Sequence, residues 1–144
     1  MSCTIAQNTI DDIIAFHGHS CPGLTIGIRA AELALLELGS PQDCDLIAVV
    51  ETDMCGVDAI QFLLSCTYGK GNLIHKDYGK MAFSFHDRYT GRGFRALLRP
   101  DVRGDMDDEL AALIRRIADG TATEADTARN ETLRESLSLR FLDL

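Results

Sequence analysis

Two helices are predicted at the start of the chain from the spacing of apolar residues. Three isoleucines share one face of residues 9–16, a spacing typical of a short amphipathic helix. A longer helix is predicted over residues 22–38, because proline suits a first helical position and apolar side chains then recur every three or four residues. Gly39 is placed to end this helix. Gly23 and Gly27 leave one early face bare, which permits close approach of a backbone or a ligand.

The middle of the chain predicts strands and one more helix. Residues 46–52 form a continuous apolar and β-branched run, typical of a central strand that is covered on both faces. A helix is predicted over residues 56–66, followed by a short strand over 72–75. Alternation of apolar and polar residues then predicts a hairpin, with strands over 80–87 and 93–99.

The composition changes after Pro100, where two further helices are predicted. The first has an acidic start, an amphipathic pattern and an end at Gly120, and a weaker one follows it. Helices, then strands, then helices again are typical of an α+β fold around a mixed sheet. We therefore expect a single domain over residues 1–144, with a core over about 10–99 and a helical extension over about 100–144.

Composition and charge exclude several classes of protein. Apolar residues make up 46% of the 144 residues, which is enough for an ordinary core, and no apolar stretch approaches the ~20 residues of a membrane span. The N-terminus lacks the basic and apolar segments of a secretory signal. The net charge of -8 argues against a nucleic-acid partner, and the arginines of residues 88–100 are scattered over mixed strand positions. We expect a soluble, cytoplasmic protein that binds neither membranes nor nucleic acids.

The clearest chemical signal is the sequence His-Gly-His-Ser-Cys-Pro-Gly at residues 17–23. If this loop is extended, the side chains of His17, His19 and Cys21 project to the same side. Imidazole and thiolate are ligands that zinc prefers, and three protein ligands with one open position are typical of a catalytic zinc site. The alternative is that one histidine forms a local hydrogen bond and Cys21 is a small buried residue.

Cys55 is placed in the sequence in the same way as Cys21. Each precedes a predicted helix, where the helix dipole and free N–H groups stabilise an anion and lower the pKa of a thiol. Asp58 is either a helix-start carboxylate or a metal ligand, and Lys80, at a strand start, is either solvated or supplies positive charge to the site. Cys66 lies about three helical turns from Cys55, too far to share its metal, and is expected to be structural.

Taken together, these motifs resemble the FmdE family, named after one of the subunits of formylmethanofuran dehydrogenase, over about residues 10–99. The resemblance is carried, in order, by FHGHSCPGLTIGIRAA, VVETDMCGVDAIQFLLSCTYGKGNLIHKDYGKMAFSF and GRGFRALLR. It implies an α+β core in which helices flank a mixed, thioredoxin-like sheet, and an active site that can hold zinc. The positions that it carries over are His17, His19, Cys21, Cys55 and Asp58. Family members with a C-terminal zinc finger have paired cysteines there, whereas this chain has no cysteine after Cys66, so no such finger is expected.

These observations lead to one main hypothesis and two alternatives. The main hypothesis is a His/Cys centre for zinc or another divalent transition metal that binds or transforms a small anionic molecule, with Cys21 and Cys55 as catalytic residues and Lys80 holding the anion. The first alternative is a thiol redox or sulfur-handling protein that uses the same two cysteines as low-pKa thiolates. The second is a non-catalytic accessory or metal-delivery subunit.

Two expectations concern protein partners. An apolar face on the final helices indicates a homodimer. The family resemblance implies a link to formylmethanofuran dehydrogenase, a molybdenum enzyme of one-carbon metabolism, and so an association with a larger oxidoreductase.

Overall fold

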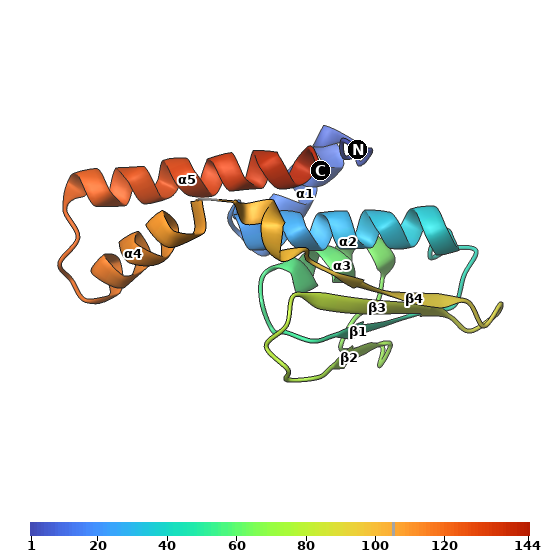
Figure 1. Cartoon of the computed structure of the whole chain (residues 1–144). Helices are drawn as coiled ribbons and strands as arrows, with labels where there is room; N and C mark the ends of the chain where they lie inside the picture. The colour runs from blue at the N-terminus through green and yellow to red at the C-terminus, as the bar shows by residue number, and fades with distance from the viewer. Residues whose placement is uncertain (105) are drawn as a thin grey trace.

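The predicted order of helices and strands is found in the computed structural model, which describes residues 1–104 and 106–144 (Figure 1). The elements are α1 (Gln7–His17), α2 (Pro22–Leu38), β1 (Leu46–Val50), α3 (Gly56–Leu64), β2 (Leu73–His75), β3 (Ala82–Asp87), β4 (Gly93–Leu97), a 3-10 turn (Pro100–Arg103), α4 (Met106–Ala118) and α5 (Glu124–Leu142). The α+β class and the C-terminal helices are therefore confirmed.

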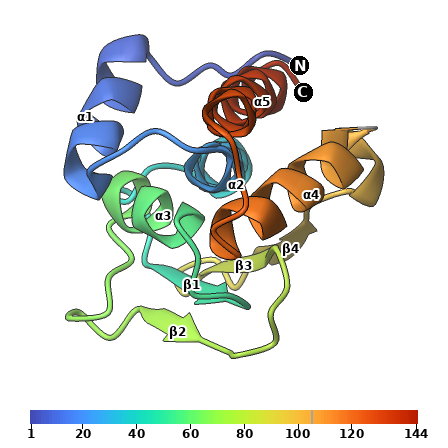
Figure 2. The same ribbon diagram turned by 90° about the vertical axis from the view of Figure 1, so that its left-hand side faces the viewer.

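The four strands form one mixed sheet in the order β2-β1-β3-β4. The central strand β1 is parallel to β2 and antiparallel to β3, so that Val50 pairs with His75 on one side and with Phe83 on the other. The helices lie over one face of this sheet (Figures 1 and 2). A thioredoxin-like topology, which the family resemblance implied, is not shown by this arrangement.

The burial of β1 differs from the sequence prediction. We expected both faces to be covered, but burial alternates along the strand, and Ile47 and Val49 are only half-buried. The reason is that the helices cover the face of Ala48 and Val50 and leave the opposite face open. A continuous apolar run therefore indicated the central position correctly and the second covering layer incorrectly.

Helix boundaries follow local signals closely where such signals exist. Helix α2 has the predicted bounds, with Pro22 in its first turn and Gly39 at a φ of 108° after its end. Helix α1 begins earlier than predicted and includes His17. Helix α3 ends at Leu64, two residues before the predicted end, because Ser65 adopts a left-handed conformation with φ 52°.

Helices α2 and α3 approach each other through glycine. A Cβ atom built on Gly27 would overlap the carbonyl oxygen of Gly56, and one built on Gly56 would lie 2.8 Å from the carbonyl oxygen of Gly23. The predicted bare face of α2 is therefore confirmed, and a backbone occupies it. This contact brings the N-terminal ends of both helices together, and with them the two cysteines that precede these helices.

The C-terminal helices form a hairpin that extends beyond the sheet (Figure 1). Near its end, α5 packs on the core through Phe141. Arg129 pairs with Glu109 at 2.7 Å and Arg116 pairs with Asp126 at 3.0 Å, which joins α4 to α5. Among the described helices, none combines the length and the apolar character that crossing a lipid bilayer requires.

Substituting Gly27→Ala is expected to destabilise the protein by at least about 2 kcal/mol, because the new methyl group must push α3 away from α2. This loss exceeds the gain of about 1 kcal/mol that alanine brings to a helix. Urea denaturation of the metal-free protein measures the free energy of unfolding. The control Gly69→Ala, whose methyl group would meet no atom within 4 Å, should change it by less than about 0.5 kcal/mol. Equal stability of the two variants would contradict the close-packing argument.

Candidate metal centre

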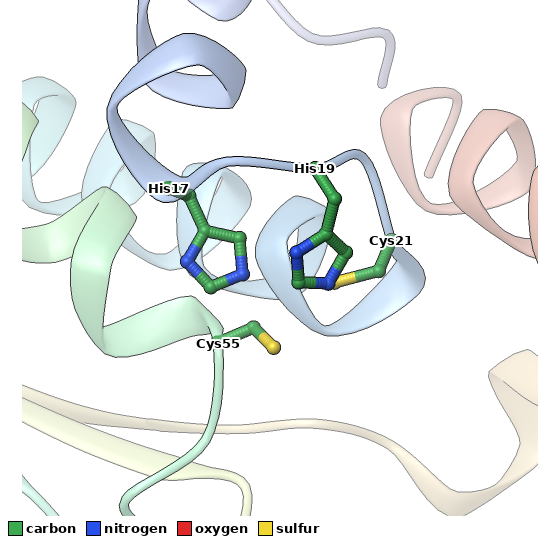
Figure 3. A group of neighbouring side chains, drawn as sticks. All are labelled: His17, His19, Cys21 and Cys55. Carbon is green, nitrogen blue, oxygen red and sulfur yellow. The ribbon is translucent and has the colours of Figure 1, made fainter.

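Four side chains with metal-binding atoms meet between α1, α2 and α3. One nitrogen each from His17 and His19 and the sulfurs of Cys21 and Cys55 all lie within 4.8 Å of one another. Figure 3 shows that the two imidazoles and the two thiols point into the same small volume. These four are among the five residues that were predicted from the sequence to meet, with Asp58 as the fifth, and the proximity of the four is confirmed.

The path that brings them together differs from the predicted one. His17 is the last residue of α1, so it is helical, and an extended loop with a period of two cannot explain its direction. Instead, Gly18 takes φ 98° and its N–H donates to the carbonyl of Ile14 at 2.8 Å, which ends the helix and turns the chain. The chain then runs past the exposed His19 to Cys21 at the start of α2.

Cys21 is fixed more firmly than Cys55. Only 4% of Cys21 is exposed, and its Sγ accepts a hydrogen bond from the backbone N–H of Leu24 at 3.4 Å, as an N-cap of α2. Cys55 precedes α3 but its side chain caps no backbone group. Its sulfur therefore lies beside that of Cys21 without a comparable anchor in the backbone.

The pKa of Cys55 departs from expectation. Burial raises the pKa of this thiol, and the neighbouring Cys21 raises it further. We expected a lowered pKa at this helix start, and this was wrong because desolvation and the second sulfur outweigh the lowering by a backbone hydrogen bond. A cation between the two sulfurs would reverse the balance, since it stabilises both thiolates.

Asp58 lies behind His17 and outside the group of four donors. The Nδ1 atom of His17 lies 2.7 Å from Oδ2 of Asp58, and Oδ1 of the same carboxylate accepts from Nε2 of Gln61 at 3.2 Å. When Nδ1–H donates to the carboxylate, the lone pair of Nε2 is free to face the sulfurs. Metal-binding histidines typically have such a carboxylate on the other ring nitrogen. From the sequence, Asp58 was either a carboxylate at the start of a helix or a metal ligand. Its contact with His17 could not be predicted, because that contact depends on the packing of α1 against α3.

The four donors fit a zinc-type ion. The side chain of His17 is only 11% exposed, and its Nε2 is buried without a hydrogen-bond partner in the described part of the chain. Such an atom is costly unless something binds it. Ligand atoms around tetrahedral zinc are about 3.3–3.8 Å apart, given bond lengths of about 2.0–2.3 Å. A spread within 4.8 Å therefore needs only a small inward movement.

Lys80 and Cys66 do not belong to this group of donors, and their hydrogen bonds are made to other residues. Lys80 donates its backbone N–H to Glu51, and its charge adds to the effect of Arg95, which hydrogen-bonds Glu51 and lowers the pKa of that carboxyl. Lys80 does not line the cavity beside the four donors, as far as the described residues define it. Cys66 is fully buried, donates to the carbonyl of Leu46 at 3.6 Å, and has its pKa raised by burial to about 11. The prediction of a structural role for Cys66 agrees with this burial.

A cavity of about 320 Å³ opens beside two of the four donors, His17 and Cys55. Its lining includes His17, Cys55 and Asp58 together with residues that no sequence motif indicated, among which Thr52, Asp53 and His75 are polar. No short motif could have indicated His75, because it reaches the site only through the pairing of β2 with β1.

Two known proteins resemble this chain over most of its length. A curated protein of Archaeoglobus fulgidus, named a probable S-adenosyl-L-methionine-binding protein, is 30% identical over 137 residues, which cover 90% of this chain and 37% of that protein. The chain thus spans little more than a third of that relative. A crystal structure from Syntrophus aciditrophicus, of a protein like the FmdE subunit of tungsten formylmethanofuran dehydrogenase, matches with a TM-score of 0.63 and 30% identity, covering 94% of this chain and 71% of that one.

A family comparison agrees with the structural one. The family described as FmdE, molybdenum formylmethanofuran dehydrogenase operon, matches residues 16–144, which include all four donors and the C-terminal helices. The chain therefore belongs to the FmdE family.

Proposed function

We propose that this protein holds zinc or another divalent transition metal through His17, His19, Cys21 and Cys55, and that this centre binds or transforms a small molecule in the adjoining cavity. The observation that carries the proposal is the buried, unpartnered Nε2 of His17 inside a group of two imidazole and two thiol donors. A bound metal of this kind supplies Lewis acidity and can activate water.

The chain anchors its four donors unequally, and this supports a reactive centre rather than a purely structural one. Asp58 orients His17, and the α2 backbone holds the sulfur of Cys21. His19 is exposed, and none of the described residues forms a hydrogen bond with its ring. We assign His19 as the ligand that leaves most easily, which gives the centre the open position that catalytic zinc sites keep. Cys55 faces the cavity and would lie beside whatever enters it.

The sequence led us to expect an anionic ligand, and the structure narrows the place where its anionic group would bind. The N-terminal end of α2 already stabilises the sulfur of Cys21 through the N–H of Leu24. An anionic group of the ligand would therefore bind at the metal rather than at a free helix end or at Lys80.

Other functions remain as candidates with their own observations. The two neighbouring thiols favour thiol redox or sulfur chemistry, although the raised pKa of Cys55 opposes a reactive thiolate in the metal-free protein. The operon named in the family description favours an accessory or metal-delivery role beside a larger oxidoreductase. The name of the archaeal relative adds S-adenosylmethionine as a candidate ligand of the cavity.

The first prediction concerns metal content. The purified wild-type protein should contain about one transition-metal ion per chain by elemental mass spectrometry, and Cys21→Ser combined with Cys55→Ser should remove most of it. The control Cys3→Ser, a cysteine outside the group, should keep the full amount. Stoichiometric metal in the double variant would contradict the assignment, as would a metal-free wild type with two titratable thiols, which would favour thiol chemistry.

The second prediction concerns Asp58. Asp58→Asn should lower zinc affinity about 10- to 100-fold, because an amide orients His17 but no longer strengthens its basicity with a negative charge. Competition with a chromophoric chelator measures this affinity. Asp12→Asn, at an exposed position of α1, is the matched control and should bind zinc like the wild type. Wild-type affinity in Asp58→Asn would show that the carboxylate does not support a metal ligand.

The third prediction concerns the homodimer, which we propose to form through α4. Ile114 and Ile117 are 50% and 41% exposed on this helix, in the hairpin that extends beyond the core (Figure 1). Light scattering after size exclusion should give the mass of two chains. Ile114→Lys combined with Ile117→Lys should give one chain with unchanged helix content, whereas the control Tyr89→Lys in the exposed β3–β4 turn should stay dimeric. A monomeric wild type would end this proposal.

A further inference from the structure

The cavity beside the metal centre has a second polar wall that the four donors do not use. It lies at the carboxyl ends of β1 and β2, where α3 begins. Because these strands are parallel and Val50 pairs with His75, both side chains point to the helix-covered face of the sheet. His75 is exposed at this edge of the sheet and lines the cavity. Crevices at the carboxyl ends of parallel strands are frequent ligand sites.

Three polar side chains of this wall have no partner within the described part of the protein. The hydroxyl of Thr52, the carboxylate of Asp53 and the ring of His75 line the cavity without a hydrogen bond or ion pair to another described residue. Thr52 is only 8% exposed, whereas Asp53 and His75 are exposed and lie at the open side of the cavity. Polar groups that line a cavity without a protein partner are available to whatever occupies it, so this wall offers binding groups to a ligand.

Charge decides what kind of molecule these groups favour. Two thiolates balance the charge of a divalent ion, and two neutral imidazoles add none. Asp58 is engaged with His17 and Gln61, whereas the carboxylate of Asp53 is not engaged. No lysine or arginine lines the cavity in the described chain. The rim at Asp53 is therefore negative, although the metal itself attracts an anionic donor atom.

We propose that the cavity binds a small zwitterion of the aminothiol or amino-acid type. An anionic donor atom of this ligand binds the metal, and its ammonium group pairs with Asp53. Thr52 and His75 supply hydrogen bonds between these two ends. This inference rests on the proposed function, because it needs a metal with an open position, and it adds the charge and the orientation of the ligand.

Three thiols with the same donor and nearly the same length provide the test. Cysteamine, 2-mercaptoethanol and 3-mercaptopropionate carry a positive, a neutral and a negative tail on two carbons. Each is titrated into the Co²⁺-substituted full-length protein while the visible spectrum of the cobalt is followed. We expect cysteamine to bind at least about tenfold more tightly than 3-mercaptopropionate, with 2-mercaptoethanol between them.

Two variants with the same chemical change separate Asp53 from the general charge of the protein. Asp53→Asn should reduce the cysteamine preference to less than about threefold, because the paired charge is lost. Asp77→Asn, an exposed position outside the cavity, should keep the full preference. His75→Ala should weaken cysteamine binding without changing the amount of bound cobalt, since His75 is not one of the four donors.

The outcomes distinguish the two levels of the proposal. A cobalt spectrum that responds equally to all three thiols, or a cysteamine preference that survives in Asp53→Asn, would overturn the zwitterion inference and leave the metal centre standing. A protein that binds no Co²⁺, or whose spectrum responds to none of the thiols, would overturn the proposed function and this inference with it.

Discussion

The close contact between the backbones of α2 and α3 is the constraint on which the site depends. Gly27 and Gly56 have no side chains, so the two helices approach more closely than any other pair of residues would permit. Their N-terminal ends then lie side by side, and Cys21 and Cys55 precede these ends. Without this contact the two thiols would not meet, and α1 could not place His17 beside them.

The two sides of the group of four donors differ in how firmly the donors are held and in how exposed they are. On the inner side, Asp58 and the α2 backbone fix His17 and Cys21. On the outer side, His19 is exposed and Cys55 faces a cavity with an unengaged carboxylate on its rim. A rigid inner half and an adaptable outer half are what a metal needs if it is to keep its place and still exchange a ligand.

Sequence reasoning succeeded where the signal is local. Pro22 and Gly39 mark the ends of α2 correctly, and alternation identified β3 and β4. It also brought both histidines and both cysteines into one group, although for His17 the reason was wrong, because the helix continues one residue further than the pattern of isoleucines suggests.

The features that sequence reasoning missed depend on contacts between distant segments. The hydrogen bond of Asp58 with His17 joins α3 to α1, and His75 reaches the cavity only because β2 pairs with β1 in parallel. The open face of β1 was missed for a similar reason, since an apolar strand sequence does not show whether helices cover one face of the sheet or both. Neither spacing nor composition carries this information.

The most direct measurement is an anomalous-scattering map of crystals of the purified protein, collected on both sides of the zinc absorption edge. The account predicts a single strong peak about 2.0–2.3 Å from Nε2 of His17 and from the sulfurs of Cys21 and Cys55. A peak at another place, or a disulfide between Cys21 and Cys55 with no peak beside it, would contradict the claim that these residues form a metal centre.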